Sequence, residues 1–251
     1  MPDTETVVRT LLGVLLLTVL TTAVLGAARV PHRFASALAI LRGTVQLALL
    51  GVVLSGVITD VRWVALALAV MFTVAAATSA RRLGDLRTHL PLTALAMGGG
   101  VLVPLAVVFA AGAIEPTARY ALAIGGIVIG NAMTTSTLAG RRVVQAVDDR
   151  WDEVEGWLAL GATPRRATID MARHGLREAI IPTTDQTRTT GLVTLPGAFV
   201  GAIFGGVSPL EAGRFQIVVL AALMATAAIT SAVIAFRLAP RTGKGSSSAA
   251  A

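Results

Sequence analysis

Residues 118–142 read ARYALAIGGIVIGNAMTTSTLAGRR, a mostly apolar run that ends in two arginines. A helix needs about 20 predominantly apolar residues to cross the hydrocarbon core of a bilayer, and arginines gather where a helix leaves the membrane on its cytoplasmic side. The run is long enough to cross, and Arg141 and Arg142 mark its end. This stretch therefore predicts a transmembrane helix that is followed by a cytoplasmic segment.

The rest of the chain repeats this pattern. Of its 251 residues, 55% are hydrophobic and 14% are charged, and the mean hydropathy of +0.76 is too high for a water-soluble domain. Seven candidate spans cover residues 7–28, 35–58, 63–80, 91–112, 118–140, 189–207 and 215–238. The sequence predicts an all-α, polytopic membrane protein of about seven transmembrane helices. We expect one transmembrane domain over residues 1–240 and a disordered tail over residues 241–251, which are rich in Ser, Gly and Ala.

The first span has a competing interpretation as a secretory signal peptide, because residues 25–28 (LGAA) resemble a cleavage site. However, the acidic residues Asp3 and Glu5 precede this run, where a signal peptide carries basic residues. We therefore expect the first span to be retained.

Lysine and arginine are distributed unevenly between the two sides of these spans. Sixteen of the 21 fall in connections on one side, four fall on the other side, and Arg42 lies inside a span. The positive-inside rule then predicts an external N-terminus and a cytoplasmic C-terminus in a bacterial plasma membrane. The net charge of +7 follows from this topology and favours anionic lipid headgroups as neighbours, so we expect no nucleic-acid partner.

Reactive side chains are scarce in this sequence. The chain has no cysteine, which excludes thiolate metal sites and cysteine nucleophiles, and its three histidines show no metal-ligand spacing. Any metal ligands therefore stay unknown. The sequence also lacks the Gly-x-x-x-x-Gly-Lys-Ser/Thr phosphate loop, so we expect no ATP or other cofactor in this chain. The spans hold no close set of acid, base and nucleophile, which favours a protein that is not an enzyme.

The longest charged segment covers residues 141–188. Its first half repeats apolar residues at helical spacing, with acidic residues on the opposite face. The apolar positions are Val147, Trp151, Val154 and Leu158. This pattern predicts an amphipathic cytoplasmic helix.

A second helix is predicted after a proline in the same segment. Thr163 stands where a helix N-cap belongs, and Pro164 occupies the first helical position. We expect this second helix to run to Ile181 and to stop at Pro182.

Glycines at four-residue spacing lie on one face of two predicted spans. Such faces let helix backbones approach closely in lipid. They are Gly126 and Gly130 in the fifth span, and Gly197, Gly201 and Gly205 in the sixth. We expect them to pack helices, either within the chain or against a second copy of it.

Four polar residues inside the spans are candidates for a transport pathway: Arg42 and Gln46, one turn apart, and Asn131 and Thr134. A charged group at the bilayer centre costs roughly 2.5 kcal/mol or more, so it is expected to face protein or water. Arg42 could instead reach the headgroups. Asn131 and Thr134 could instead form hydrogen bonds between helices.

Four ordered motifs resemble one known family. They are residues 42–47 (RGTVQL), residues 130–133 (GNAM), residues 155–167 with LGA at 160–162, and residues 191–197 (GLVTLPG) followed by 205–210 (GGVSPL). In these motifs the chain is similar to the FetB/YbbM permease family.

This resemblance implies the permease subunit of an ABC transporter that exports iron or another metal ion. It further implies a homodimer that works with two copies of a cytoplasmic ATPase of the FetA type, which binds ATP and Mg. A plant branch of the family is linked to aluminium tolerance. The resemblance places the ATPase contact on a helix expected over residues 151–162, at Glu155, Trp157, Leu158, Leu160, Gly161 and Ala162. An ion-coupled secondary transporter and an ABC permease for a non-metal solute are the alternatives.

Overall fold

The computed structural model describes residues 4–57 and 60–240. Every regular element in these two ranges is an α-helix. The helices are α1 (Thr4–Ala27), α2 (Phe34–Val57), α3 (Val61–Leu83), α4 (Leu86–Ala110), α5 (Ala118–Asp149), α6 (Trp151–Ala159), α7 (Pro164–Ala167), α8 (Ile169–Thr189), α9 (Gly197–Phe204) and α10 (Pro209–Leu238). The predicted tail at residues 241–251 lies outside the described residues.

Six helices are long and apolar enough to cross a membrane: α1, α2, α3, α4, α5 and α10. The prediction of an all-α, polytopic membrane protein is therefore confirmed. The expected span over residues 189–207 is not one helix, because α8 ends at Thr189 and α9 has only eight residues. Between them, Gly191 adopts a left-handed backbone with φ 86°. The sequence shows only the apolar character of this run, whereas the turn at Gly191 divides it.

Helix α8 also differs from the sequence prediction, because it continues through Pro182 instead of stopping there. A proline inside a helix lacks one hydrogen-bond donor and costs about 3 kcal/mol. Helix α8 packs along both α5 and α10, and buries Met171, Ala179 and Thr183 among other side chains. This packing holds the helix together across the proline.

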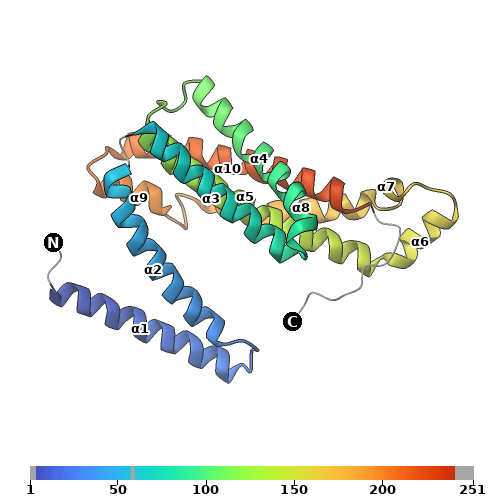
Figure 1. Ribbon diagram of the computed structural model, residues 1–251, viewed down its shortest axis with the longest axis horizontal. Helices are drawn as coiled ribbons and strands as arrows, with labels where there is room; N and C mark the ends of the chain where they lie inside the picture. Colours follow the sequence, from blue (N-terminus) through green and yellow to red (C-terminus); the bar gives the residue numbers. More distant parts are fainter. Residues whose placement is uncertain (1–3, 58–59, 241–251) are drawn as a thin grey trace. The chain divides into compact units, whose positions relative to one another are not determined.

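The chain divides into two compact units, residues 1–58 and 59–251. In the first unit, a tight turn joins α1 to α2 (Figure 1). Most described side chains of this unit are both apolar and exposed, as at Leu16 and Leu38. Such a surface fits a hydrocarbon environment. The single transmembrane domain over residues 1–240 stays a prediction.

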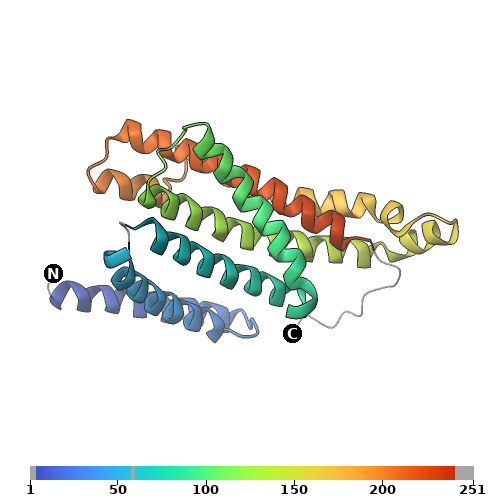
Figure 2. The ribbon, with the colours of Figure 1, turned by 45° about the horizontal axis from the view of Figure 1, so that its top comes forward.

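The second unit is a helical bundle built around α5 and α10, which run side by side in both ribbon views (Figures 1 and 2). Helices α3 and α4 pack against each other and against α5, while α8 packs on α5 and α10. The largest apolar core includes Met97, Ile124, Val128 and Val219. Helix α5 has 32 residues and is therefore about 48 Å long, well beyond a hydrocarbon core of about 30 Å.

The connection from α3 to α4 is short and capped. The side chain of Asp85 accepts hydrogen bonds from the backbone N–H and the hydroxyl of Thr88, at 3.1 and 3.0 Å. These bonds hold the pKa of Asp85 below its usual value. Asp85 thereby caps the first turn of α4.

Close helix contacts occur mainly at glycines other than those selected from the sequence. A Cβ at Gly126 would lie 3.3 Å from the Met71 side chain, but one at Gly130, Gly197 or Gly201 would meet nothing within 4 Å. A Cβ at Gly205 would meet only the carbonyl oxygens of its own turn. Among these five, only Gly126 would bring an added Cβ within 4 Å of another described helix. Packing of the others against a second copy stays a prediction.

We predict that Gly175→Ala destabilises the protein by about 1–3 kcal/mol, because overpacking a tight contact displaces backbone. The added Cβ would lie 2.8 Å from the backbone nitrogen of Val143 and 2.9 Å from its Cα. Gly197→Ala is the matched control, since its Cβ would occupy open space. Thermal unfolding in detergent, followed by tryptophan fluorescence, measures both. Equal melting temperatures for the two variants would refute the close contact between α5 and α8.

Candidate functional site

A polar pocket of about 340 Å³ lies between α5, α8 and α10 of the second unit. Asn131, Thr134 and Thr135 line it from α5, and Thr183 and Gln186 line it from α8. The remaining lining is apolar or backbone: Ile127, Gly130, Leu138, Ala179, Pro182 and Leu223. The pocket therefore presents neutral hydrogen-bonding groups inside an otherwise apolar bundle.

Asn131 ties the three walls of the pocket together. Its Nδ2 donates to the carbonyl oxygen of Leu223 on α10 at 3.0 Å. Its Oδ1 accepts from the hydroxyl of Thr183 on α8 at 3.5 Å. Hydrogen bonds between membrane helices contribute about 0.6–2 kcal/mol each, so this amide fixes the spacing of the walls as well as their polarity.

The polar groups of the pocket suit a polar or hydrated solute. The hydroxyl of Thr134 donates to the carbonyl of Gly130 at 3.1 Å, which leaves its oxygen lone pairs available as acceptors. The residues that line the pocket include no charged side chain. Among the described residues, no group of three or more His, Asp or Glu side chains could hold a metal ion. The chemistry offered here is hydrogen bonding and coordination by neutral oxygen.

The hydroxyl-rich run of α5 divides between two partners. Thr134 and Thr135 face the pocket, whereas the Ser136 hydroxyl is 3.0 Å from that of Ser79, which also accepts from Thr137 at 3.2 Å. These three buried hydroxyls join α5 to α3. They are therefore part of the helix packing rather than of the pocket.

Two pocket residues, Thr183 and Gln186, escaped the sequence prediction. The sequence predicts a helix that ends at Ile181, so both residues fell in the charged segment over residues 141–188, before the span predicted at residues 189–207. Their spacing of three residues places them on one helical face once the helix is known to continue. That spacing was the available signal.

Arg42 and Gln46 lie on α2 in the first unit, and both side chains are exposed. They do not line the polar pocket, whereas Asn131 and Thr134 do. The four pathway candidates are therefore divided between the two units. The role of Arg42 and Gln46 stays a prediction.

The charged segment over residues 141–188, which is predicted to contact the ATPase, is ordered by a small apolar cluster. Val147 on α5, Val154 on α6 and Met171 on α8 are fully buried, and Trp151 and Leu158 pack against them. This cluster holds α6 at the end of the bundle, where α6 and α7 extend past α5 and α8 (Figure 1). Val147, Trp151, Val154 and Leu158 thus form the inward face that their helical spacing predicts.

The outward face of this segment is apolar at two positions. Trp157 is 45% exposed and Leu160 is 82% exposed, whereas Leu158 is directed toward the cluster. Glu155 is exposed beside them. A bound partner would therefore meet Trp157 and Leu160, with Glu155 as a polar contact.

Helix α6 ends at Ala159, three residues before the predicted end at Ala162. The N–H of Gly161 donates to Leu158 at 2.9 Å, and the N–H of Ala162 donates to Trp157 at 3.0 Å. This pair of bonds requires a left-handed residue, and Gly161 has φ 84°. Thr163 then caps α7 and Pro164 takes its first position, which confirms that part of the prediction.

The comparisons with known proteins place most of the chain in one group. Residues 8–242 match the model described as Uncharacterised protein family (UPF0014). The chain is 37% identical over 195 residues to UPF0014 membrane protein STAR2 of Oryza sativa subsp. japonica, across 77% of this chain and 68% of the relative. It is 33% identical over 192 residues to Protein ALUMINUM SENSITIVE 3 of Arabidopsis thaliana, across 76% of this chain and 70% of the relative.

A bacterial relative carries a functional name. The chain is 36% identical over 143 residues to the Probable iron export permease protein FetB of Escherichia coli (strain K12), across 57% of this chain and 54% of the relative. The resemblance found in the sequence motifs is thereby confirmed. No solved structure matches the chain.

We predict that Gly161→Ala loosens the end of α6, because a side chain at a left-handed position costs about 1 kcal/mol relative to glycine. Gly156→Ala is the matched control. It lies within α6 with nothing within 4 Å of an added Cβ, so it strengthens the helix by about 0.5–1 kcal/mol. Hydrogen exchange of the α6 amides measures both variants. Equal protection in both would show that the turn at Gly161 is not held as described.

Proposed function

The chain belongs to the UPF0014 family of membrane proteins, and on that premise we propose that it is the membrane-spanning permease subunit of an ABC transporter. It exports iron or another metal ion across a bacterial plasma membrane, with an external N-terminus and a cytoplasmic C-terminus. It works as a homodimer with two copies of a separate cytoplasmic ATPase, which binds ATP and Mg. The bacterial relative named as a probable iron export permease supports this assignment.

The observation that carries the proposal is the apolar surface of α6 at the end of the bundle. Exposed tryptophan and leucine in an aqueous segment are typical of the buried centre of a protein contact. Trp157 and Leu160 are the anchors, and Glu155 is a polar contact. The cluster at Val154 keeps this surface rigid, which lowers the entropy lost on binding.

Two continuous helices connect this surface to the polar pocket. Helix α5 carries both Asn131 in the pocket and Val147 in the cluster. Helix α8 carries both Thr183 in the pocket and Met171 in the cluster. When the ATPase dimer closes on ATP, it displaces α6. This displacement moves α5 and α8, which form two walls of the pocket. Export then follows from a change in spacing between α5 and α8 around the solute.

A second candidate function is an ABC permease for a polar non-metal solute. The neutral lining of the pocket favours it, because a desolvated metal ion prefers carboxylate, imidazole or thiolate ligands. For a metal ion, the same lining fits a hydrated or complexed form.

We predict that Trp157→Asp combined with Leu160→Asp weakens binding of the ATPase by about 30-fold, the loss expected for removal of a 2 kcal/mol anchor. The measurement is co-purification of the co-expressed ATPase from detergent, followed by titration of the purified subunits. Leu210→Asp is the matched control, because Leu210 is 80% exposed at the first turn of α10, away from α6. An unchanged affinity in the double variant would remove α6 as the coupling element.

We also predict that Thr183→Val slows transport by about tenfold, while Thr183→Ser retains it, because only valine removes the hydroxyl that bonds Asn131. Vesicles that contain both subunits are tested for ATP-dependent movement of iron, other metal ions and polar organic solutes. Both variants keep ATPase binding, which separates a pocket defect from a docking defect. Transport of an organic solute without any metal would select the second candidate. Equal rates in both variants would exclude this pocket from the path.

A further inference from the structure

The turn between α1 and α2 is built with an arginine where glycine is usual. The N–H of Arg29 donates to Gly26 and the N–H of Val30 donates to Leu25, both at 3.0 Å. This pair of bonds closes a helix through a left-handed residue, a position that glycine most often fills because it has no Cβ. Here Arg29 takes it with φ 53°, and His32 is also left-handed with φ 61°. Two large basic side chains therefore leave the same turn.

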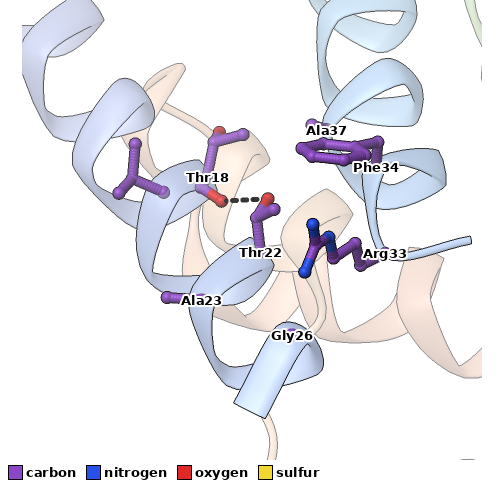
Figure 3. A pocket seen from close by; sticks show the side chains of 8 residues that line it. Thr18, Thr22, Ala23, Gly26, Arg33, Phe34 and Ala37 are labelled. Carbon is purple, nitrogen blue, oxygen red and sulfur yellow. Dashed lines mark hydrogen bonds between the residues drawn. The ribbon is translucent and has the colours of Figure 1, made fainter. Parts of the chain in front are cut away.

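A third basic side chain, Arg33, lies inside the angle between the two helices. Figure 3 shows its guanidinium group between Gly26 of α1 and Phe34 of α2. The guanidinium carbon is 5.1 Å from the centroid of the Phe34 ring. A Cβ at Gly26 would lie only 3.3 Å from Nη1 of Arg33. The absent side chain at Gly26 thus makes the room that Arg33 occupies.

The same angle holds two adjoining cavities of different polarity. One, of about 420 Å³, is lined by Arg29, His32 and Arg33 together with neighbouring backbone. The other, of about 570 Å³, extends along the helices past Val19, Ala23 and Ala37. Gly26, Arg33 and Phe34 line both cavities, which joins them into one groove, the α1–α2 groove.

The far part of this groove is effectively apolar. Thr18 and Thr22 line it, but the Thr18 hydroxyl donates to the carbonyl of Val14 at 2.7 Å. The Thr22 hydroxyl donates to the carbonyl of Thr18 at 2.8 Å (Figure 3). Their hydrogens are therefore used within α1. The groove begins in basic groups and continues into methyl and ring surfaces.

The basic end has no acidic partner among the residues that line it. In the described part of the first unit, an ion pair joins Glu5 to Arg9, near the other end of α1. The guanidinium groups at the turn are consequently available for an anion, and arginine suits phosphate because it can donate two parallel hydrogen bonds.

We propose that the α1–α2 groove binds one anionic phospholipid, with its phosphate between Arg29 and Arg33 and one acyl chain along Val19, Ala23 and Ala37. His32 adds a further ring N–H donor beside the phosphate. A free phosphate ester shares the headgroup chemistry but leaves the apolar part of the groove uncovered. A lipid covers both ends at once, and basic residues next to a membrane span attract anionic headgroups.

The test is native mass spectrometry of the full chain, released from detergent that contains equal amounts of phosphatidylglycerol and phosphatidylcholine with identical acyl chains. We expect the chain to retain phosphatidylglycerol preferentially. Arg29→Gly combined with Arg33→Gln should lower this retention by at least about tenfold, given about 1 kcal/mol for each basic residue near the headgroups. Glycine suits the left-handed position at residue 29, so this variant keeps the turn.

A second variant and a matched control separate a built site from general charge. Gly26→Leu keeps the charge of the chain unchanged but fills the junction of the groove that Arg33 occupies, and it should lose the lipid as well. Arg81→Gln combined with Arg82→Gln removes the same charge from the exposed end of α3, and it should change retention less than about twofold. Equal losses in both double variants would overturn the proposal.

Two further outcomes would also overturn it. Displacement of the lipid by millimolar glycerol phosphate would assign the groove to a free phosphate ester. The chain has no cysteine, so Ala23→Cys provides a single thiol for cross-linking. A cross-link between two copies at this position, with no lipid retained, would assign the groove to a contact between copies of the chain.

Discussion

Backbone hydrogen bonds inside hydrocarbon have no water to replace them, and this constraint shapes every long helix of the protein. Each unsatisfied backbone group costs several kcal/mol there, so the chain crosses in continuous helices wherever it can. Between α8 and α9, the chain satisfies its backbone groups in a local turn. The N–H groups of Val193 and Thr194 donate to Thr189, and the N–H of Gly191 donates to Thr194. A left-handed Gly191 permits this compact turn.

In the proposed transport cycle, the continuity of α5 and α8 suits them to carry movement. Both remain helical from the polar pocket to the apolar cluster at α6, and α8 does so even across Pro182. Asn131 and Thr183 link the two helices at one end, and Val147 and Met171 link them at the other. A rigid pair joined at two levels transmits a displacement, whereas a loop would absorb it.

Several parts of this arrangement were predictable from spacing alone. The inward face at Val147 and Val154 follows from helical periodicity. The start of α7 at Thr163 and Pro164 follows from capping preferences. Predictions failed where a local signal competed with tertiary packing. Pro182 predicts the end of a helix, but α8 continues past it because α8 packs against α5 and α10. At Gly197 and Gly201, an added Cβ would meet nothing within 4 Å in the described residues, so their packing against a second copy stays a prediction.

By itself, the sequence determined the membrane class, most of the spans, the position of the amphipathic segment and the family. These properties depend on composition and on spacing within one helix. Only the tertiary structure decided that Thr183 joins Asn131 in a pocket, that Leu158 points inward while Trp157 and Leu160 stay exposed, and that Arg33 lies over Phe34. Each of these depends on which helix faces which. That choice is made by packing between segments distant in the chain, and local sequence does not encode it.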